Sequence, residues 1–154
     1  MKTKTLMLTL AVCFIGAAAC FAQDPNIGTW KLNEAKSHMP AEATKVATVI
    51  FAAEGDNMKV TQEATDKDGK PIHSEWTGKF DGKDYPVTGN PAIDSRSYKK
   101  IDDRTMVATN KKDGKVVITA RSVVSADGKT RTVHLTITDS AGKKVAGTAV
   151  SDKQ

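Results

Sequence analysis

Cysteine is nearly missing from this sequence. The two cysteines, Cys13 and Cys20, both fall within the first 22 residues, so the rest of the chain can form no disulfide. That part must be stabilised by packing and backbone hydrogen bonds. A zinc site built on thiolates is excluded there for the same reason.

Aromatic residues and charge of one sign are also scarce. Phe, Trp and Tyr make up 5% of the chain, too little for the aromatic girdles of an outer-membrane barrel. The formal net charge is +5, and the basic residues are scattered rather than gathered into a nucleic-acid footprint. We therefore predict neither an outer-membrane barrel nor a nucleic-acid partner.

Sequence motifs for catalysis and metal binding are missing as well. The chain contains no Gly-x-Ser-x-Gly, no phosphate-binding glycine loop and no His-Glu-x-x-His. His38, His73 and His134 lack metal-ligand spacing. The acidic residues lie mostly in turns, where no carboxylate pair for acid–base chemistry can be assigned. We predict no catalytic residue, no metal and no cofactor.

The first 22 residues have the pattern of a secretory signal peptide. Lys2 and Lys4 precede an apolar stretch, Leu6–Phe21, that is short for a membrane span, and cleavage is predicted after Ala22. Lipidation of Cys20 is the alternative. Residues 23–154 have the length of one domain. We expect an exported protein, periplasmic or secreted, with no integral membrane span after cleavage.

What the sequence does contain is a series of tight turns. Asp-Gly-Lys occurs at 68–70, 81–83, 113–115 and 127–129. Because Asp-Gly between segments rich in Val, Ile and Thr is typical of hairpins, the series predicts an antiparallel meander. A short helical turn is expected at Asn33–Ser37 and a long irregular connection at Asp84–Pro91. The predicted strands are Gly28–Leu32, Lys45–Ala53, Met58–Ala64, Ile72–Phe80, Asp94–Lys100, Thr105–Lys111, Lys115–Ser125, Thr130–Thr138 and Lys144–Ser151.

Apolar and polar residues alternate along these strands, which gives each strand one buried and one solvated face. Tight hairpins between such strands favour an all-β, up-and-down antiparallel barrel of eight to ten strands over a sandwich, because a sandwich needs longer crossings. The residues predicted to face inward are Met58, Val60, Ala64, Ile72, Trp76, Phe80, Val116, Ile118, Ala120, Val124, Val133, Leu135 and Ile137.

Two segments carry a family resemblance. They are Gly28-Thr29-Trp30-Lys31-Leu32-Asn33 with Ala35-Lys36-Ser37, and Phe80–Pro91. With them the chain resembles the lipocalin and fatty-acid-binding superfamily, and more closely small secreted bacterial proteins described as lipocalin-like. The resemblance implies a barrel that holds a small, mostly apolar ligand.

The same resemblance implies a structural role for Gly28 and Trp30 at the closed end of the barrel, where an arginine from a late strand covers the tryptophan. This chain departs from that pattern, because its last predicted strand contains no arginine. Arg121 and Arg131 are the available substitutes. Arg131 shares the apolar face of Val133, whereas Arg121 lies on the more polar face of its strand.

Five residues are candidates for ligand binding: Trp76, Tyr85, Arg96, Tyr98 and Arg131. Arg96 and Tyr98 share one strand face, and facing inward they would grip a carboxylate or another acidic group. Because Lys100 lies on the same face, the sequence slightly favours the opposite orientation, with Ser95, Ser97 and Ile101 inward. Trp76 fits the core better than a ligand platform. Tyr85 either covers the barrel mouth or anchors a loop.

Three functions remain open from the sequence. The leading hypothesis is a non-catalytic barrel that binds a small hydrophobic or amphipathic ligand. The second is a solid barrel that contacts an envelope partner through loops such as Asp84–Pro91. The third is an unrecognised enzyme, which would require Arg96, Tyr98 and Arg131 to cluster inside the barrel.

Overall fold

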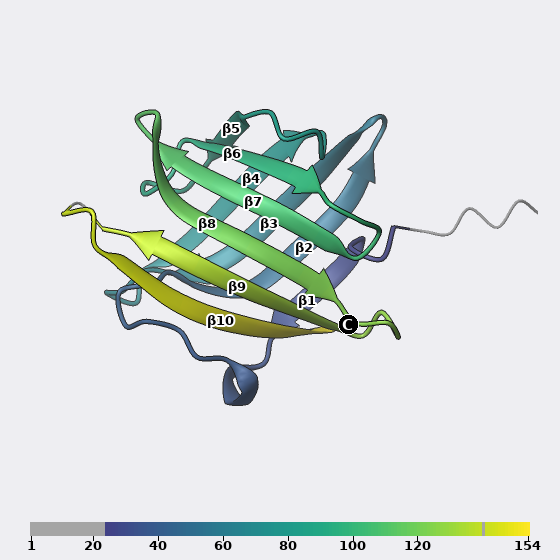
Figure 1. The fold of residues 1–154 in the computed structure, drawn as a ribbon, viewed down its shortest axis with the longest axis horizontal. Coiled ribbons are helices and arrows are strands. Elements are labelled where there is room, and N and C mark those ends of the chain that lie inside the picture. The colour runs from purple at the N-terminus through teal and green to yellow at the C-terminus, as the bar shows by residue number, and fades with distance from the viewer. Residues whose placement is uncertain (1–23, 140) are drawn as a thin grey trace, which may run out of the picture.

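A computed structural model describes residues 24–139 and 141–154 (Figure 1). The predicted signal peptide, its cleavage site and Cys20 lie outside the described residues. Within them, no helix is long and apolar enough to cross a membrane.

The described chain is an all-β antiparallel meander that closes into a barrel of ten strands, as the sequence predicts. Each strand pairs with its neighbours in the chain, and β1 pairs with β10 to close the ring. One 3-10 turn, η1 (Glu34–Lys36), follows β1, and the side chain of Asn33 caps it. The strands are β1 (Gly28–Leu32), β2 (Lys45–Glu54), β3 (Asn57–Thr65), β4 (Pro71–Gly78), β5 (Tyr85–Thr88), β6 (Ser95–Lys100), β7 (Thr105–Lys112), β8 (Lys115–Val124), β9 (Thr130–Thr138) and β10 (Lys144–Lys153).

Consecutive connections of an antiparallel barrel lie at opposite ends, which defines two ends here. The end that we call the base carries the segment 24–27 and the β2–β3, β4–β5, β6–β7 and β8–β9 connections. The end that we call the mouth carries the long β1–β2 connection, residues 33–44, which we call the strap. The strap crosses back to β10, where His38 and Thr148 form an antiparallel bridge.

The sequence prediction was wrong for Asp84–Pro91, because part of this segment is the strand β5. Tyr85 and Pro86 pair with Arg96 and Ser95 of β6, and Val87 pairs with Trp76 of β4. Pro86 lacks an N–H group and weakens the strand signal in the sequence. The hydrogen-bond demand of the neighbouring strands, which a local pattern does not contain, decides the structure.

An aromatic cluster fills the half of the barrel next to the base. The ring of Trp76 lies 4.9 Å from that of Tyr98 and 6.2 Å from that of Phe80, and Phe51 lies 6.0 Å from Tyr98. Trp76 is 1% exposed, and its Nε1 donates to the backbone oxygen of Arg96 at 2.8 Å. Full burial of such side chains stabilises a fold by roughly 2–3 kcal/mol each. The prediction that Trp76 belongs to the core is therefore confirmed.

The predicted strand faces are confirmed along β3 and β4, but β8 differs at one position. Val116 is 43% exposed, although the alternation predicts that it faces inward with Ile118. The register between β7 and β8 shifts between Asn110 and Lys111, where β8 carries one extra residue. A bulge of this kind reverses the face on which later side chains lie.

Trp30 closes the base, but the cation beside it is a lysine. Trp30 is fully buried, and its Nε1 donates to the backbone oxygen of Asn26 at 2.8 Å. Lys153 of β10 places its Nζ 5.1 Å from the centre of the Trp30 ring. The proposed substitutes lie elsewhere: Arg131 stands over Phe51, and Arg121 is exposed. A lysine at the end of the last strand thus takes the place that the family resemblance gives to an arginine.

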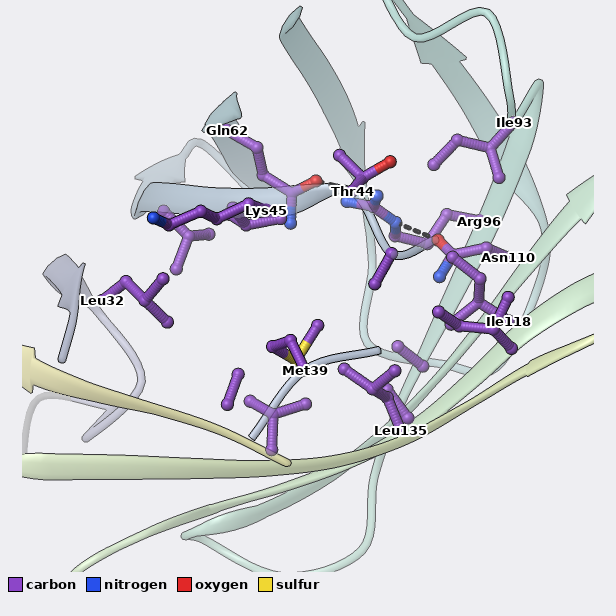
Figure 2. A pocket seen from close by; sticks show the side chains of 18 of the residues that line it. Leu32, Met39, Thr44, Lys45, Gln62, Ile93, Arg96, Asn110, Ile118 and Leu135 are labelled. Carbon is purple, nitrogen blue, oxygen red and sulfur yellow. Dashed lines mark hydrogen bonds between the residues drawn. The ribbon is translucent and has the colours of Figure 1, made fainter. Parts of the chain in front are cut away.

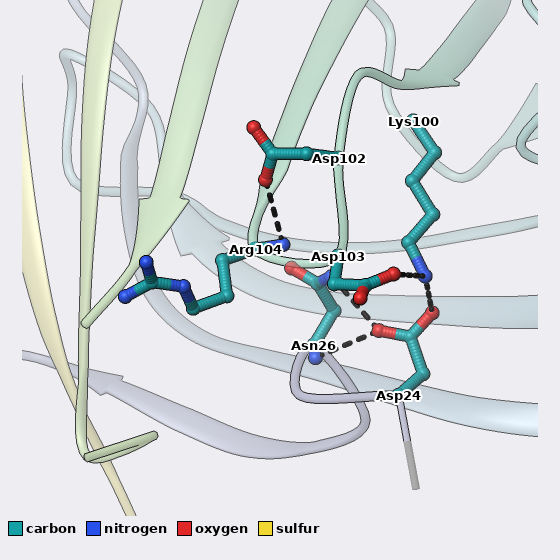
Figure 3. A network of polar contacts seen from close by, with 6 residues as sticks. All are labelled: Asp24, Asn26, Lys100, Asp102, Asp103 and Arg104. Carbon is teal, nitrogen blue, oxygen red and sulfur yellow. Dashed lines mark hydrogen bonds and ion pairs between the residues drawn. The ribbon is translucent and has the colours of Figure 1, made fainter. Parts of the chain in front are cut away.

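A polar network ties the segment 24–27 to the barrel (Figure 3). The Asp24 carboxylate accepts hydrogen bonds from the backbone N–H and side chain of Asn26, and from Lys100 Nζ at 3.0 Å. Burial alone raises the pKa of Asp24, but these hydrogen bonds outweigh it and hold the pKa below its usual value. The ionised carboxylate therefore favours the closed base.

Gly89 gives a direct test of how tightly the mouth is packed. Its φ is +79°, and a Cβ atom there would lie 2.0 Å from the backbone oxygen of His73. Gly128 has a similar φ of +71° with nothing within 4 Å. Left-handed strain alone predicts that Gly128→Ala lowers the free energy of unfolding by about 1 kcal/mol. Gly89→Ala adds the clash with the backbone oxygen of His73, so urea denaturation should show a free energy of unfolding lowered by about 3 kcal/mol. Equal losses would contradict this packing.

Candidate functional site

A cavity of about 150 Å³ lies inside the barrel between the aromatic cluster and the strap. Figure 2 shows side chains that line it, among them Met39 of the strap. Its apolar wall comes from inward positions of several strands and from the strap. The side chains that form this wall include Val46, Ile118, Val133, Leu135 and, from the strap, Met39 and Ala43. The barrel interior is therefore not solid.

Arg96 lies on one wall of this cavity, held by uncharged oxygen atoms. Its side chain is 4% exposed and donates to Gln62 Oε1 at 2.9 Å, to Tyr98 Oη at 3.3 Å and to Asn110 Oδ1. Figure 2 shows the bonds to Gln62 and Asn110 from opposite sides of the guanidinium. Arg96 is thus fixed in place without a negative charge beside it.

Arg131 of β9 also points into the barrel, with fewer partners. It is 9% exposed, and its Nε is buried without a hydrogen-bond acceptor. Its guanidinium carbon lies 5.1 Å from the centre of the Phe51 ring, a cation–π contact. Burial lowers the pKa of Arg131; the nearby Tyr98 opposes this effect, and positively charged Arg96 adds to it. A guanidinium nevertheless remains protonated at neutral pH.

The two guanidinium groups share the interior with no counter-ion among the described residues. Neither forms an ion pair with a carboxylate, and the acidic side chains in ion pairs belong to the surface or the rims. No described Asp or Glu is buried or lines the cavity. A buried charge is expensive unless it is paired. Both guanidinium groups are already buried, so an anion that entered the cavity would not have to displace bulk water from them.

The orientation that the sequence slightly favoured for β6 was wrong. Arg96 and Tyr98 face inward, at 4% and 3% exposure, whereas Ile101 is 50% exposed. Lys100 misled the prediction because it stands at the end of β6. There its side chain leaves the barrel and pairs with Asp24 at the base.

The remaining candidates fall into two groups. Arg131 and Trp30 line the cavity together with Arg96 and Tyr98. Trp76 and Tyr85 do not; Tyr85 packs edge-on against Trp76, with ring centres 5.6 Å apart, and donates to Asp81 at the base. Tyr85 therefore does not cover the mouth.

Sequence reasoning missed Gln62 and Asn110, although a signal for both was present. Gln62 interrupts the apolar face that Val60 and Ala64 define on β3. Asn110 likewise follows Met106 and Ala108 on the inward face of β7. A lone amide on an otherwise apolar inward face indicates a buried hydrogen-bond partner.

The chain matches no protein family and no curated protein. Among solved structures it is similar to one described as a redesigned beta barrel, mFAP1, bound to DFHBI. The TM-score is 0.46 and the sequence identity 13%, over 84% of this chain and 95% of that chain. The lipocalin resemblance of the two sequence segments stays a prediction. Within the described ranges, no group of three His, Cys, Asp or Glu side chains is placed to hold a metal ion.

Replacing each of the two arginines with methionine should change the free energy of unfolding in opposite directions. Arg131→Met removes a buried charge that lacks a counter-ion, so the free energy of unfolding should rise by about 1–2 kcal/mol. Arg96→Met leaves Gln62 and Asn110 without their hydrogen-bond donor, so the free energy of unfolding should fall by about 2–3 kcal/mol. Urea denaturation in a buffer free of carboxylates measures both. A loss of stability in Arg131→Met would show that Arg131 is a structural residue.

Proposed function

We propose that this protein is a non-catalytic binding protein whose barrel takes up a small amphipathic molecule with one negatively charged group. The observation that carries the proposal is the pair of buried guanidiniums, Arg96 and Arg131, without a carboxylate near them. An anion in the cavity that both arginines line would supply the missing charge, and the free Nε of Arg131 offers it a hydrogen-bond donor.

The size of the cavity supports a compact ligand body. An apolar cavity of about 150 Å³ accommodates a molecule the size of benzene. Drug-sized ligands generally occupy pockets of about 300–1,000 Å³. The apolar wall around Ile118, Val133 and Leu135 fits an aromatic or branched aliphatic group. We therefore take a benzoate-like carboxylate as the simplest representative of the ligand class.

The side chains around the cavity support binding rather than catalysis. Among the described residues, its lining includes no carboxylate, imidazole or thiol that would act as a general base or nucleophile. Arg96, Tyr98 and Arg131 do line the same cavity, and the enzyme hypothesis requires them to lie together inside the barrel. They provide charge and hydrogen-bond donors, which bind an anion without further chemistry. The cavity also speaks against the solid barrel of the second hypothesis.

The location and relationship of the protein remain parts of this proposal. The signal-like pattern of residues 1–22 supports export to the periplasm or beyond, with lipidation of Cys20 as the alternative. The Gly28-Thr29-Trp30 motif supports a relationship to lipocalin-like proteins. Such a protein would carry or sequester its ligand outside the cytoplasm.

Isothermal titration calorimetry with benzoate and with benzyl alcohol tests the proposed function. Benzoate should bind, and the uncharged alcohol of similar shape should bind at least about tenfold more weakly. Arg131→Met should lose benzoate affinity by a similar factor. The matched control is Arg121→Met, which removes an exposed arginine from the outer face of β8 and should leave the affinity unchanged.

Two results would contradict the proposed function. One is equal affinity for benzoate and benzyl alcohol, which would remove the need for a negative charge. The other is no benzoate binding to a protein that circular dichroism shows to be folded.

A further inference from the structure

A second hollow lies outside the mouth and shares a wall with the interior cavity. This outer cleft has a volume of about 360 Å³ and lies between the strap and the β3–β4 turn. Leu32, Met39, Ala43 and Lys45 line both spaces. These shared side chains, with Met39 and Ala43 supplied by the strap, therefore form the layer between the buried cavity and the outer cleft.

The part of the strap that forms this layer is held weakly. His38 exchanges two backbone hydrogen bonds with Thr148 of β10, at 2.7 and 2.8 Å. Beyond this bridge, residues 39–44 make no hydrogen bond to a strand within the described chain; Ala43 N–H donates to Pro40 inside the strap. Methionine is unbranched and changes rotamer easily. A small rearrangement at Met39 would join the two spaces.

The outer cleft is polar, and its charged side chains already have partners. Lys45 pairs with Glu34 at 2.6 Å, and Lys67 pairs with Asp68 at 2.8 Å. Asp66 Oδ1 accepts the backbone N–H groups of the β3–β4 turn. A further charge would have to compete with these partners. An uncharged group with several hydrogen-bonding atoms fits the cleft best.

We propose that the outer cleft is a second binding subsite, which holds the uncharged polar end of the same ligand. The ligand would place its carboxylate at Arg96 and Arg131 and its apolar body in the cavity. A hydroxyl- or amide-bearing group would pass Met39 into the outer cleft. This inference rests on the proposed interior site, and the experiment separates the two.

The probes are benzoate and 4-carboxyphenyl β-D-glucoside, which adds a sugar opposite the carboxylate. Calorimetry on the full chain should give about tenfold higher affinity for the glucoside, because two or more added hydrogen bonds have that effect. Ala41→Trp places a large side chain in the outer cleft from an exposed strap position and should abolish this gain without changing benzoate binding. The matched control is Glu42→Trp, the neighbouring exposed position outside the cleft lining, which should preserve the gain.

Each outcome decides a different point. Benzoate binding without a gain from the sugar overturns the outer subsite alone. A gain that survives Ala41→Trp overturns it as well, because the sugar would then lie elsewhere. No binding of either probe overturns the interior site and the outer subsite together.

Discussion

Two positively charged side chains, Arg96 and Arg131, lie inside a closed barrel, and the rest of the structure must stabilise the fold against the cost of burying them. Arg96 is held by the uncharged oxygens of Gln62, Asn110 and Tyr98. Arg131 rests on the ring of Phe51 and has an unpaired Nε. Both arrangements orient a guanidinium without neutralising it. Because a buried charge without a partner opposes folding, the rest of the barrel has to supply the stability. Such a cost is usual where a site is organised for a ligand before the ligand arrives.

The two ends of the barrel differ in how tightly they are packed. At the base, the aromatic cluster around Trp76 and the closure of Trp30 by Asn26 and Lys153 form a dense, solid region. Toward the mouth the packing leaves a cavity with a largely aliphatic wall, and strap residues 39–44 cover it without a hydrogen bond to a strand in the described chain. Regions with few hydrogen bonds and little packing open at the lowest free-energy cost. For the binding function that we propose, the ligand is therefore expected to enter at the mouth.

Local pattern was enough to predict most of the architecture and three of the side chains that line the cavity, Arg96, Tyr98 and Arg131, but not how these side chains are arranged. The Asp-Gly-Lys turns and the period of two predicted nine strands close to their observed bounds, because both signals come from neighbouring residues. The sequence did not predict β5, because Pro86 weakens its strand signal. It also did not predict the bulge beside Asn110, which places Val116 on the surface. Lys100 lies on the same strand face as Arg96 and therefore favoured the wrong orientation of β6. The sequence does not show that the Lys100 side chain leaves the barrel at the end of the strand. The sequence also did not show that Lys153 covers Trp30 or that no carboxylate reaches Arg131. Both depend on contacts between segments far apart in the chain.

A crystal structure with 4-bromobenzoate would show whether Arg96 and Arg131 form an anion site that is ready before any ligand arrives. Anomalous scattering from bromine locates the ring independently of the carboxylate. We predict one bromine peak inside the barrel, with the carboxylate within hydrogen-bond distance of Arg131 and the side chains of Arg96, Gln62 and Asn110 unmoved. A barrel whose interior contains no bromine at saturating ligand, or a carboxylate bound away from both arginines, would contradict it.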